Sequence, residues 1–329
     1  MADPTPHPVR RPVRPACPWA ARPWALGALA GLAGVFGAVP ALAADGFTAA
    51  DSVASVVGMA ADPDHGYYWV PDRTAGRVQA LGRDGAVQGS VTYGATPVNV
   101  QAITYRNERL WVGDVGDPSG SRKSISVYRF GDLGLGGNAP YRHYSLTYPD
   151  GAKDSAAMTV SRNNRIYVAT LGAKPGIYRS VAEPSPGGVA NQLTRVGDAP
   201  ADVTDMTFSP DGGLVLRTAD AIYAYEVDRF GQTGAAPLPQ AARGEAITPS
   251  LSGASLLVSG QETPVVMSTV AVPTTVQPIT PSPSPTASAS ASPANSTPSA
   301  IAQNRGTLWA LALAGVIATA AGAVVALKR

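Results

Sequence analysis

Short apolar runs alternate with polar, Gly- and Pro-containing breaks through residues 45–273 of the 329-residue chain. The runs are four to seven residues long and rich in β-branched and aromatic side chains, and apolar residues at the helical spacing of about 3.6 are almost absent. Runs of this kind, bounded by Gly, Pro, Asp and Asn, are typical of β-strands and turns. The pattern therefore predicts an all-β domain.

The pattern also repeats along the chain. Five short apolar segments each lead through a turn into a second segment that holds an apolar pair, such as Trp69-Val70 or Trp111-Val112. Successive repeats begin 41 to 55 residues apart, and a four-stranded unit of about 40–50 residues is the period of a β-propeller blade. The five leading segments are residues 58–62, 102–105, 157–161, 205–209 and 246–250.

We therefore predict a β-propeller of about five four-stranded blades. Fourth strands are evident at residues 87–93, 143–148 and 192–196, but the last blade lacks one. Residues 47–56 would supply it and close the ring, which would hide both open sheet edges. The alternative is a sixth, degenerate blade or an incomplete ring. Third strands are expected at residues 77–81, 124–130, 176–179, 221–226 and 265–270.

Several motifs carry a resemblance to a known family. Residues 110–117 read Leu-Trp-Val-Gly-Asp-Val-Gly-Asp, and further motifs lie at 127–130, 148–154, 203–212 and 244–247. In this order they resemble secreted actinobacterial β-propellers of the WD-repeat-like and phytase-esterase-like kind, over residues 98–270. The resemblance implies a propeller fold, and the family name suggests hydrolysis of ester or phosphoester substrates.

Both ends of the chain predict targeting segments. Residues 1–43 combine a basic start, a short apolar run and an Ala-x-Ala site before Ala44, which is typical of a secretory signal peptide; the alternative is an N-terminal membrane anchor. Residues 307–327 carry no charge and are long enough for a transmembrane helix, followed by the basic tail 328–329. The Pro/Ser/Thr/Ala-rich residues 274–306 predict an extended stalk.

This layout predicts a propeller, residues 44–273, on the extracellular face of the plasma membrane, single-pass, with the C-terminus in the cytoplasm. The whole chain has a formal net charge of +2, but residues 45–262 hold 18 basic and 22 acidic side chains, a net of −4. That charge argues against a nucleic-acid partner. The only cysteine, Cys17, lies in the predicted leader, so no disulfide is expected in the propeller.

The starts of the inner strands should point into the central channel, where a propeller would hold ligands. The predicted channel positions are Val57, Gln101, Ala156, Thr204 and Glu245, and one carboxylate in five makes a poor catalytic ring. The resembled family usually has Glu-Asp where this chain has Gln101-Ala102, and His-Asp-x-Glu-Ala where it has Lys-Asp-Ser-Ala-Ala at 153–157. We predict no catalytic residue.

Five acidic residues are the candidates for ligand binding: Asp114, Asp117, Asp154, Asp205 and Glu245. Asp114 and Asp117 would coordinate a cation at the channel rim or cap a Gly-rich turn. Asp154 and Asp205 would be channel ligands or accept hydrogen bonds from a neighbouring blade. Glu245 is the best single candidate.

Residues 62–66, Asp-Pro-Asp-His-Gly, superficially resemble a calcium loop but align with a hairpin turn of the repeat, which is the reading we favour. No cofactor is expected, the alternative being a divalent cation such as calcium. The predicted function is a binding or scaffolding module without catalysis, for an unidentified envelope protein or glycan. The alternative is a metal-assisted phosphoesterase or esterase-like hydrolase with a degenerate site.

Overall fold

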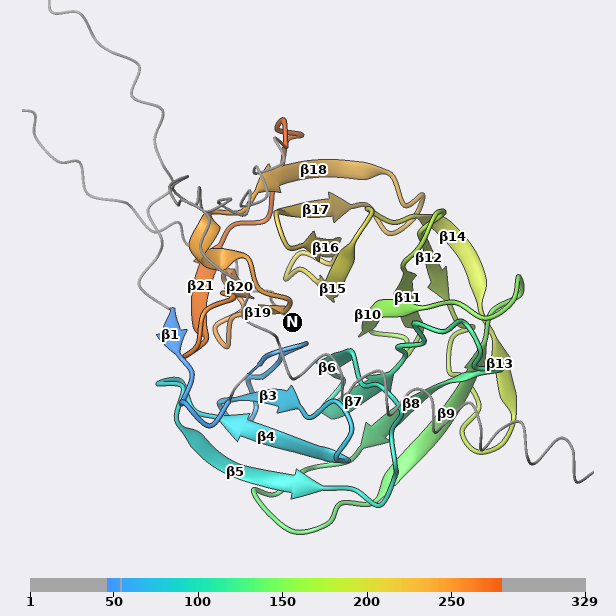
Figure 1. Ribbon diagram of the computed structural model, residues 1–329, viewed down its shortest axis with the longest axis horizontal. Helices are drawn as coiled ribbons and strands as arrows, with labels where there is room; N and C mark the ends of the chain where they lie inside the picture. Colours follow the sequence, from blue (N-terminus) through green and yellow to red (C-terminus); the bar gives the residue numbers. More distant parts are fainter. Residues whose placement is uncertain (1–45, 54, 280–329) are drawn as a thin grey trace, which may run out of the picture. The chain divides into compact units, whose positions relative to one another are not determined.

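Five β-sheets stand around a central axis in the computed structural model, which describes residues 46–53 and 55–279 (Figure 1). The innermost strand of each sheet contacts the innermost strand of the next, and the last of them contacts the first. The described residues therefore form a five-bladed, all-β propeller, as predicted. The inner strands are β2 (Ala60–Asp62), β6 (Ala102–Arg106), β10 (Ser155–Val160), β15 (Val203–Phe208) and β19 (Ile247–Pro249).

The other strands of each blade follow outward in antiparallel order. Two of the predicted third strands, β4 (Arg77–Leu81) and β12 (Gly176–Arg179), have the bounds expected from the sequence, and the rest differ by a residue at an end. The second strands are β3 (Tyr67–Pro71), β7 (Arg109–Asp114), β11 (Ile166–Thr170), β16 (Leu214–Thr218) and β20 (Leu256–Ser259). The third strands are β4 (Arg77–Leu81), β8 (Ile125–Phe130), β12 (Gly176–Arg179), β17 (Ala221–Tyr225) and β21 (Val266–Val270).

The observed fourth strands agree with the sequence prediction in part and correct it in part. They are β5 (Val87–Thr92), β9 (Tyr141–Thr147), β14 (Thr194–Asp198) and β18 (Gln232–Pro237). The sequence did not reveal β18, because its Gly-Ala-Ala centre lacks the β-branched and aromatic signal. The strand predicted from residue 192 begins two residues later, since Gln192 instead ends β13 (Ala190–Gln192), which pairs with β9 of the previous blade.

The ring is closed by the N-terminal segment. The two-residue strand β1 (Phe47–Thr48) pairs antiparallel with β21 and becomes the fourth strand of the last blade, as the sequence predicts. The Phe47 ring lies 5.1 Å from that of Tyr68 in the first blade. The chain also passes close to Gly85, where a Cβ would overlap the carbonyl of Thr48. Closure therefore joins the first and last blades through both backbone and side chains.

The hydrophobic core is divided among the spaces between neighbouring blades. Strands β10 and β11 are buried along their whole lengths because both faces of the sheet pack against other blades. Trp69 and Trp111, from the predicted apolar pairs, are almost fully buried in two different clusters. The repeat thus places one large apolar pair per blade where the blades meet.

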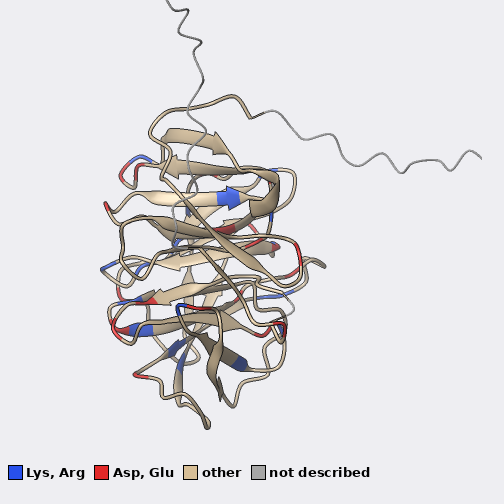
Figure 2. Cartoon of the chain, turned by 90° about the vertical axis from the view of Figure 1, so that its left-hand side faces the viewer, with Lys and Arg blue, Asp and Glu red and all other residues tan. Residues whose placement is uncertain are grey.

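Several outer strands have partners beyond their own blade. Strand β13 runs parallel to β9, Asn138 bridges Thr92 of β5, and Val276 bridges Ala235 of β18. These additions satisfy backbone groups that an open sheet edge would leave unpaired. Figure 2 shows the charged residues mainly in the turns and loops between strands, so most of the charged side chains lie near the ends of the strands.

The predicted signal peptide, transmembrane helix and nearly all of the predicted stalk lie outside the described residues. Within residues 46–53 and 55–279, no helix has the length and apolar character to cross a membrane.

The ring closure leads to a stability prediction. Phe47→Ala removes a ring that is 8% exposed and packed on Tyr68, so we expect a loss of about 3 kcal/mol in the free energy of unfolding. Urea denaturation followed by circular dichroism measures it. The matched control is Val98→Ala, at a residue 62% exposed, which should change stability by less than about 0.5 kcal/mol. Equal effects of the two substitutions would contradict the role of β1.

Candidate functional site

The five acidic residues singled out by the sequence lie at one end of the propeller strands. Asp154 directly precedes the inner strand β10, and Glu245 lies two residues before the inner strand β19. Asp205 is the third residue of β15. Asp114 ends β7, whose end pairs with the start of β6. We call this the strand-start end. The inner hairpin turns lie at the other end of the same strands.

Asp114 is fully engaged by its neighbours. Its carboxylate is almost completely buried and receives two hydrogen bonds from the Arg122 guanidinium, 2.9 Å to Oδ1 and 3.0 Å to Oδ2. The backbone N–H of Asn99, in the connection from the first blade, donates a third at 2.7 Å. This bidentate pair fixes the β7–β8 loop against the preceding connection.

Asp117 caps that same loop. Its carboxylate accepts hydrogen bonds from the backbone N–H groups of Ser121 and Arg122, at 3.1 and 2.8 Å, and from the Ser119 hydroxyl. Burial by itself would raise the pKa of Asp117, but these donors outweigh it and lower the pKa. The backbone N–H of Asp117 in turn donates to Asp154 Oδ1 at 2.7 Å, which joins the second and third blades.

Asp205 lies completely inside the protein. Its two oxygens accept from the backbone N–H of Met206 at 2.8 Å and of Ile247, in the next blade, at 2.9 Å. Burial raises the pKa of Asp205, while the two backbone donors and the nearby Arg217 oppose the rise. The structure therefore gives Asp205 a place between the fourth and fifth blades, away from solvent.

Arg217 also connects the fourth blade with the fifth. Its side chain is fully buried, and it donates to the backbone carbonyls of Ala242, Gly244 and Ala246 in the connection to the fifth blade, at 2.6 to 2.9 Å. Burial lowers the pKa of Arg217 to about 10, which leaves it charged at neutral pH. Nothing in the sequence pattern singled out this residue.

Glu245 is the most accessible of the five predicted residues. Its side chain is 48% exposed and forms an ion pair with Arg73 of the first blade at 2.9 Å. Within the described residues, no hydrogen bond joins Glu245 to the other four. The same part of the chain contains no group of three or more His, Cys, Asp or Glu side chains that could hold a metal ion.

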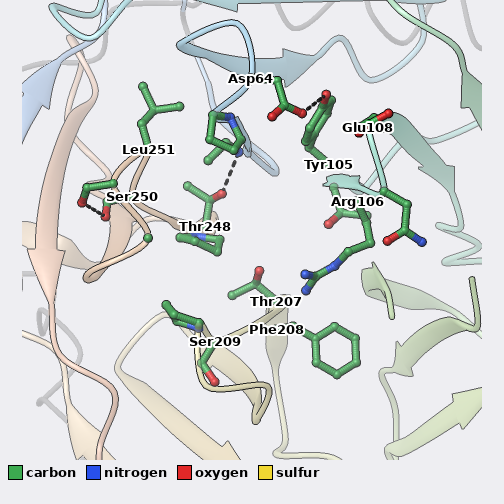
Figure 3. Close-up of a pocket in the computed structure, with 18 residues that line it drawn as sticks. Asp64, Tyr105, Arg106, Glu108, Thr207, Phe208, Ser209, Thr248, Ser250 and Leu251 are labelled. Atoms are coloured by element: carbon green, nitrogen blue, oxygen red, sulfur yellow. Dashed lines mark hydrogen bonds between the residues drawn. The ribbon is translucent and has the colours of Figure 1, made fainter. Parts of the chain in front are cut away.

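A cavity of about 400 Å³ lies at the opposite end, at the mouth formed by the inner hairpin turns (Figure 3). We call it the mouth pocket. Four blades line it: residues 61, 63 and 64 from the first, 104–108 from the second, 207–210 from the fourth and 248–253 from the fifth. None of the five predicted residues is among them.

A carboxylate and a phenol form a pair on one side of the mouth pocket. The Tyr105 hydroxyl donates to Asp64 Oδ2 at 2.8 Å (Figure 3). Burial, followed by the hydrogen bond to Asp64, raises the pKa of Tyr105, so its hydroxyl keeps its proton. Figure 3 shows Glu108 beside them, and its carboxylate has no hydrogen-bond or ion-pair partner within the described residues.

Arg106, the last residue of β6, points into the same cavity (Figure 3). Its Nε donates to the carbonyl of Val160 at 3.2 Å, and its guanidinium carbon lies 5.5 Å from the centre of the Phe208 ring. Among residues 46–53 and 55–279, the two terminal nitrogens have no hydrogen-bond or ion-pair partner. Burial and the nearby Arg162 lower the pKa of Arg106.

The sequence analysis missed these residues because it searched the starts of the inner strands. The sequence does contain one signal, the dipeptide Asn107-Glu108 in the hairpin between β6 and β7. In the structure both residues have positive φ, 54° and 57°. A two-residue turn of this type favours Asn-Gly, so a glutamate in the second position is unusual. Residues 62–66 form a hairpin turn, in which the backbone N–H of His65 donates to Asp62 Oδ1 at 3.1 Å.

No protein-family model and no curated protein matches the sequence. Solved structures that resemble it include a gluconolactonase from Xanthomonas campestris, 15% identical over 64% of this chain and 70% of that chain, with a TM-score of 0.42. Another is a candidate 6-phosphogluconolactonase from Bacteroides uniformis, 18% identical over 66% of this chain and 67% of that one, TM-score 0.38. A third is a Bacteroides caccae protein of unknown function, 9% identical over 54% and 59%, TM-score 0.37.

The prediction of a binding or scaffolding module without catalysis is corrected by this comparison. Two of the similar propellers are described as a gluconolactonase and a candidate 6-phosphogluconolactonase, and not as binding modules. At these identities the likeness shows the β-propeller fold alone.

The Arg217 junction yields a prediction for stability. Arg217→Met leaves the carbonyls of the connection to the fifth blade without their buried donor and removes the positive charge near Asp205, so we expect a loss of about 3–5 kcal/mol in the free energy of unfolding. Adding Asp205→Asn should restore part of that loss because the uncompensated charge is gone. Urea denaturation of both single variants and the double variant measures the coupling. Losses that simply add, within about 0.5 kcal/mol, would show that the two charges do not interact.

His65 yields a pH prediction. Its Nδ1 lies 3.0 Å from Asp62 Oδ2 and its Nε2 lies 3.2 Å from Asp132 Oδ1. The hydrogen bond to Asp62 is the largest cause that raises the pKa of His65, and the charges of Asp62, Asp132 and Asp64 add to it against partial burial. The stabilisation is therefore complete below about pH 6.5 and is lost as the pH rises through the folded-state pKa.

NMR titration of the His65 ring should give a pKa above 6.5, and Asp132→Asn should reduce the shift. The denaturation midpoint of the unmodified protein should fall relative to that of His65→Asn as the pH rises from 6 to 9. A pKa at or below 6.5 would contradict the ion pairs.

Proposed function

We propose that this protein hydrolyses a carboxylic ester or lactone in the mouth pocket. The observation that carries the proposal is the gathering of the Asp64–Tyr105 pair and the free carboxylate of Glu108 in one cavity of about 400 Å³. A cavity of roughly 300–1,000 Å³ suits a small-molecule substrate. A carboxylate and a phenol are groups that transfer protons in ester hydrolysis.

Glu108 is the proposed general base. Its carboxylate lines the cavity and has no partner within the described residues, so it is free to accept a proton from a water molecule as that water attacks the carbonyl carbon. In the free protein the single O–H of Tyr105 donates to Asp64 and keeps its proton. When the substrate binds, this O–H turns from Asp64 and donates its hydrogen bond to the developing oxyanion or the leaving oxygen. The ester C–O bond breaks, the leaving oxygen takes up a proton, and an acid and an alcohol result.

The position of Glu108 in the fold supports this assignment. A glutamate at a φ of 57° costs about 1 kcal/mol relative to an unstrained residue, and such strain clusters at functional sites. The esterase part of the alternative drawn from the sequence, including the resemblance to phytase-esterase-like propellers, agrees with the proposal. The participation of calcium or another divalent cation stays a prediction, and the assay below includes it.

The setting remains part of the proposal. We propose that the propeller acts on the extracellular face of the plasma membrane, held there by the transmembrane helix predicted at residues 307–327, and that an envelope protein or glycan is the source of the ester. The layout of apolar, basic and Pro/Ser-rich segments at the two ends of the sequence supports this setting.

The proposal predicts the behaviour of a single substitution. Glu108→Gln keeps the shape of the side chain but removes the base, so kcat for ester hydrolysis should fall about 100-fold or more. Purified protein is assayed for acid release from a panel of aryl esters and lactones, with and without calcium, manganese or zinc. Lactones belong in the panel because the names of two similar propellers contain that substrate class.

The matched control is Glu183→Gln, which changes another glutamate with positive φ, at 51°, outside the mouth pocket. It should leave kcat within about twofold of the unmodified protein. Full activity of Glu108→Gln, or no hydrolysis of any compound in the panel under any metal condition, would overturn the proposal.

A further inference from the structure

Arg106 is the one strongly charged group of the mouth pocket that the proposed reaction does not use. It projects into the cavity from the end of β6, and only its Nε has a hydrogen-bond partner in the described part of the chain. A guanidinium carries five N–H donors, so most of its donors face the cavity unpaired. A charged group in this position is stabilised by an anion or costs free energy.

The orientation of the guanidinium is fixed before any ligand arrives. The bond from Nε to the carbonyl of Val160 anchors one edge, and the Phe208 ring packs against the group at 5.5 Å. A guanidinium held in this way presents its remaining donors as a planar fork, which matches the two oxygens of a carboxylate or a phosphate. A flexible surface arginine would lose this geometry.

The surrounding charges do not neutralise Arg106. The carboxylate of Asp64 accepts the Tyr105 hydroxyl, and no ion pair connects any acidic side chain of residues 46–53 or 55–279 with Arg106. Its cross-strand partner in the hairpin is Arg109, and Arg162 of the next blade is close enough to disfavour the charge on Arg106. Like charges placed opposite one another are destabilising in a sheet, and within the described residues Arg106 has no acidic partner of its own to offset them.

Hydroxyl groups complete the surroundings. Figure 3 shows Thr207 of the fourth blade beside the guanidinium of Arg106. Ser209 lies on the same side of the cavity, but its hydroxyl already donates to Asp211 and to the carbonyl of Gly213. Hydroxyls donate hydrogen bonds to anionic oxygens as readily as they accept them. The cavity thus has a side with carboxylates and a phenol, and a side with a guanidinium and hydroxyls.

We propose that the mouth pocket binds an anionic substrate. The guanidinium of Arg106 donates hydrogen bonds to a carboxylate or phosphate group of this substrate, and the scissile ester lies toward Glu108. The part of this inference that concerns the ester rests on the proposed hydrolysis. The part that concerns anion binding depends only on Arg106. It assigns the substrate class as an ester or lactone that carries a second, acidic group.

Binding is tested first, without turnover. Succinate, inorganic phosphate and the neutral succinamide are titrated into the full-length protein at low salt, with melting temperature and isothermal calorimetry as readouts. Succinate or phosphate should raise the melting temperature and succinamide should not. The tighter of the two anions identifies the recognised group. Arg106→Gln should weaken the binding about tenfold or more, and Arg106→Lys should retain part of it.

The matched control is Arg109→Gln, which removes the same charge from the opposite strand of the same hairpin. Arg109 is absent from the lining of the mouth pocket, and its guanidinium donates to the carbonyl of Glu108. This variant should bind the anion like the unmodified protein. Equal weakening by Arg106→Gln and Arg109→Gln would show unspecific attraction and overturn the inference, as would the absence of binding in the unmodified protein.

Turnover is tested separately. The ratio of kcat/KM for an anionic aryl hemisuccinate to that for the neutral aryl acetate should fall at least tenfold in Arg106→Gln. Binding of the anion without hydrolysis of either ester would overturn the proposed function and leave this inference standing. Hydrolysis with no preference for the anionic ester, together with no anion binding, would overturn this inference and leave the proposed function standing.

Discussion

The propeller depends on the pairing of two short segments that are far apart in the sequence. Strand β1 contributes only two residues, yet it completes the last blade, and the following residues add hydrogen bonds from Ala49 to Val265 and from Ala50 to Gly85. Inner and second strands such as β10 and β11 are buried on both faces only because every blade has a neighbour on each side. An open ring would expose the cluster that contains Phe47 and Met267 to water. The mouth pocket shares this dependence, because four separate blades supply its lining.

Closure also explains why the two ends of the strands differ in chemistry. At the strand-start end, acidic groups connect neighbouring segments: Asp154 accepts from the backbone of Asp117, and Asp205 accepts from that of Ile247. Arg217 binds the carbonyls of the connection that follows its blade. These charged groups are satisfied by the protein itself, so a ligand would have to displace existing hydrogen bonds. At the hairpin end, the donors of Arg106 and the carboxylate of Glu108 have no such partners among the described residues, and a ligand would add hydrogen bonds without breaking any.

The sequence predicted the repeat well because strand signals are local. Runs of β-branched and aromatic residues between turns gave five blades and the closing role of residues 47–56, whereas β18 was missed because Gly234, Ala235 and Ala236 carry no such signal. The candidate site was harder to predict. Acidic residues near strand starts look alike in a sequence whether they bind a ligand or a backbone N–H of the next blade. Asp64, Glu108 and Ser209 come from three different hairpins, and only the closed ring brings them to one cavity.

The hairpin between β6 and β7 is locally unfavourable in ways that the fold does not require. Its two turn residues, Asn107 and Glu108, both adopt positive φ although neither is glycine, and Arg106 and Arg109 face each other across the strands. A sequence selected only for stability would place glycine in the turn and opposite charges beside it. In natural proteins, such conflicts between local preference and global fold are concentrated where function demands them. The same four residues place a free carboxylate and an unpaired guanidinium at one cavity, and these are the two groups that an acidic ester would need. The cost of this hairpin therefore supports the proposal that the mouth pocket, rather than the strand-start end, binds the substrate.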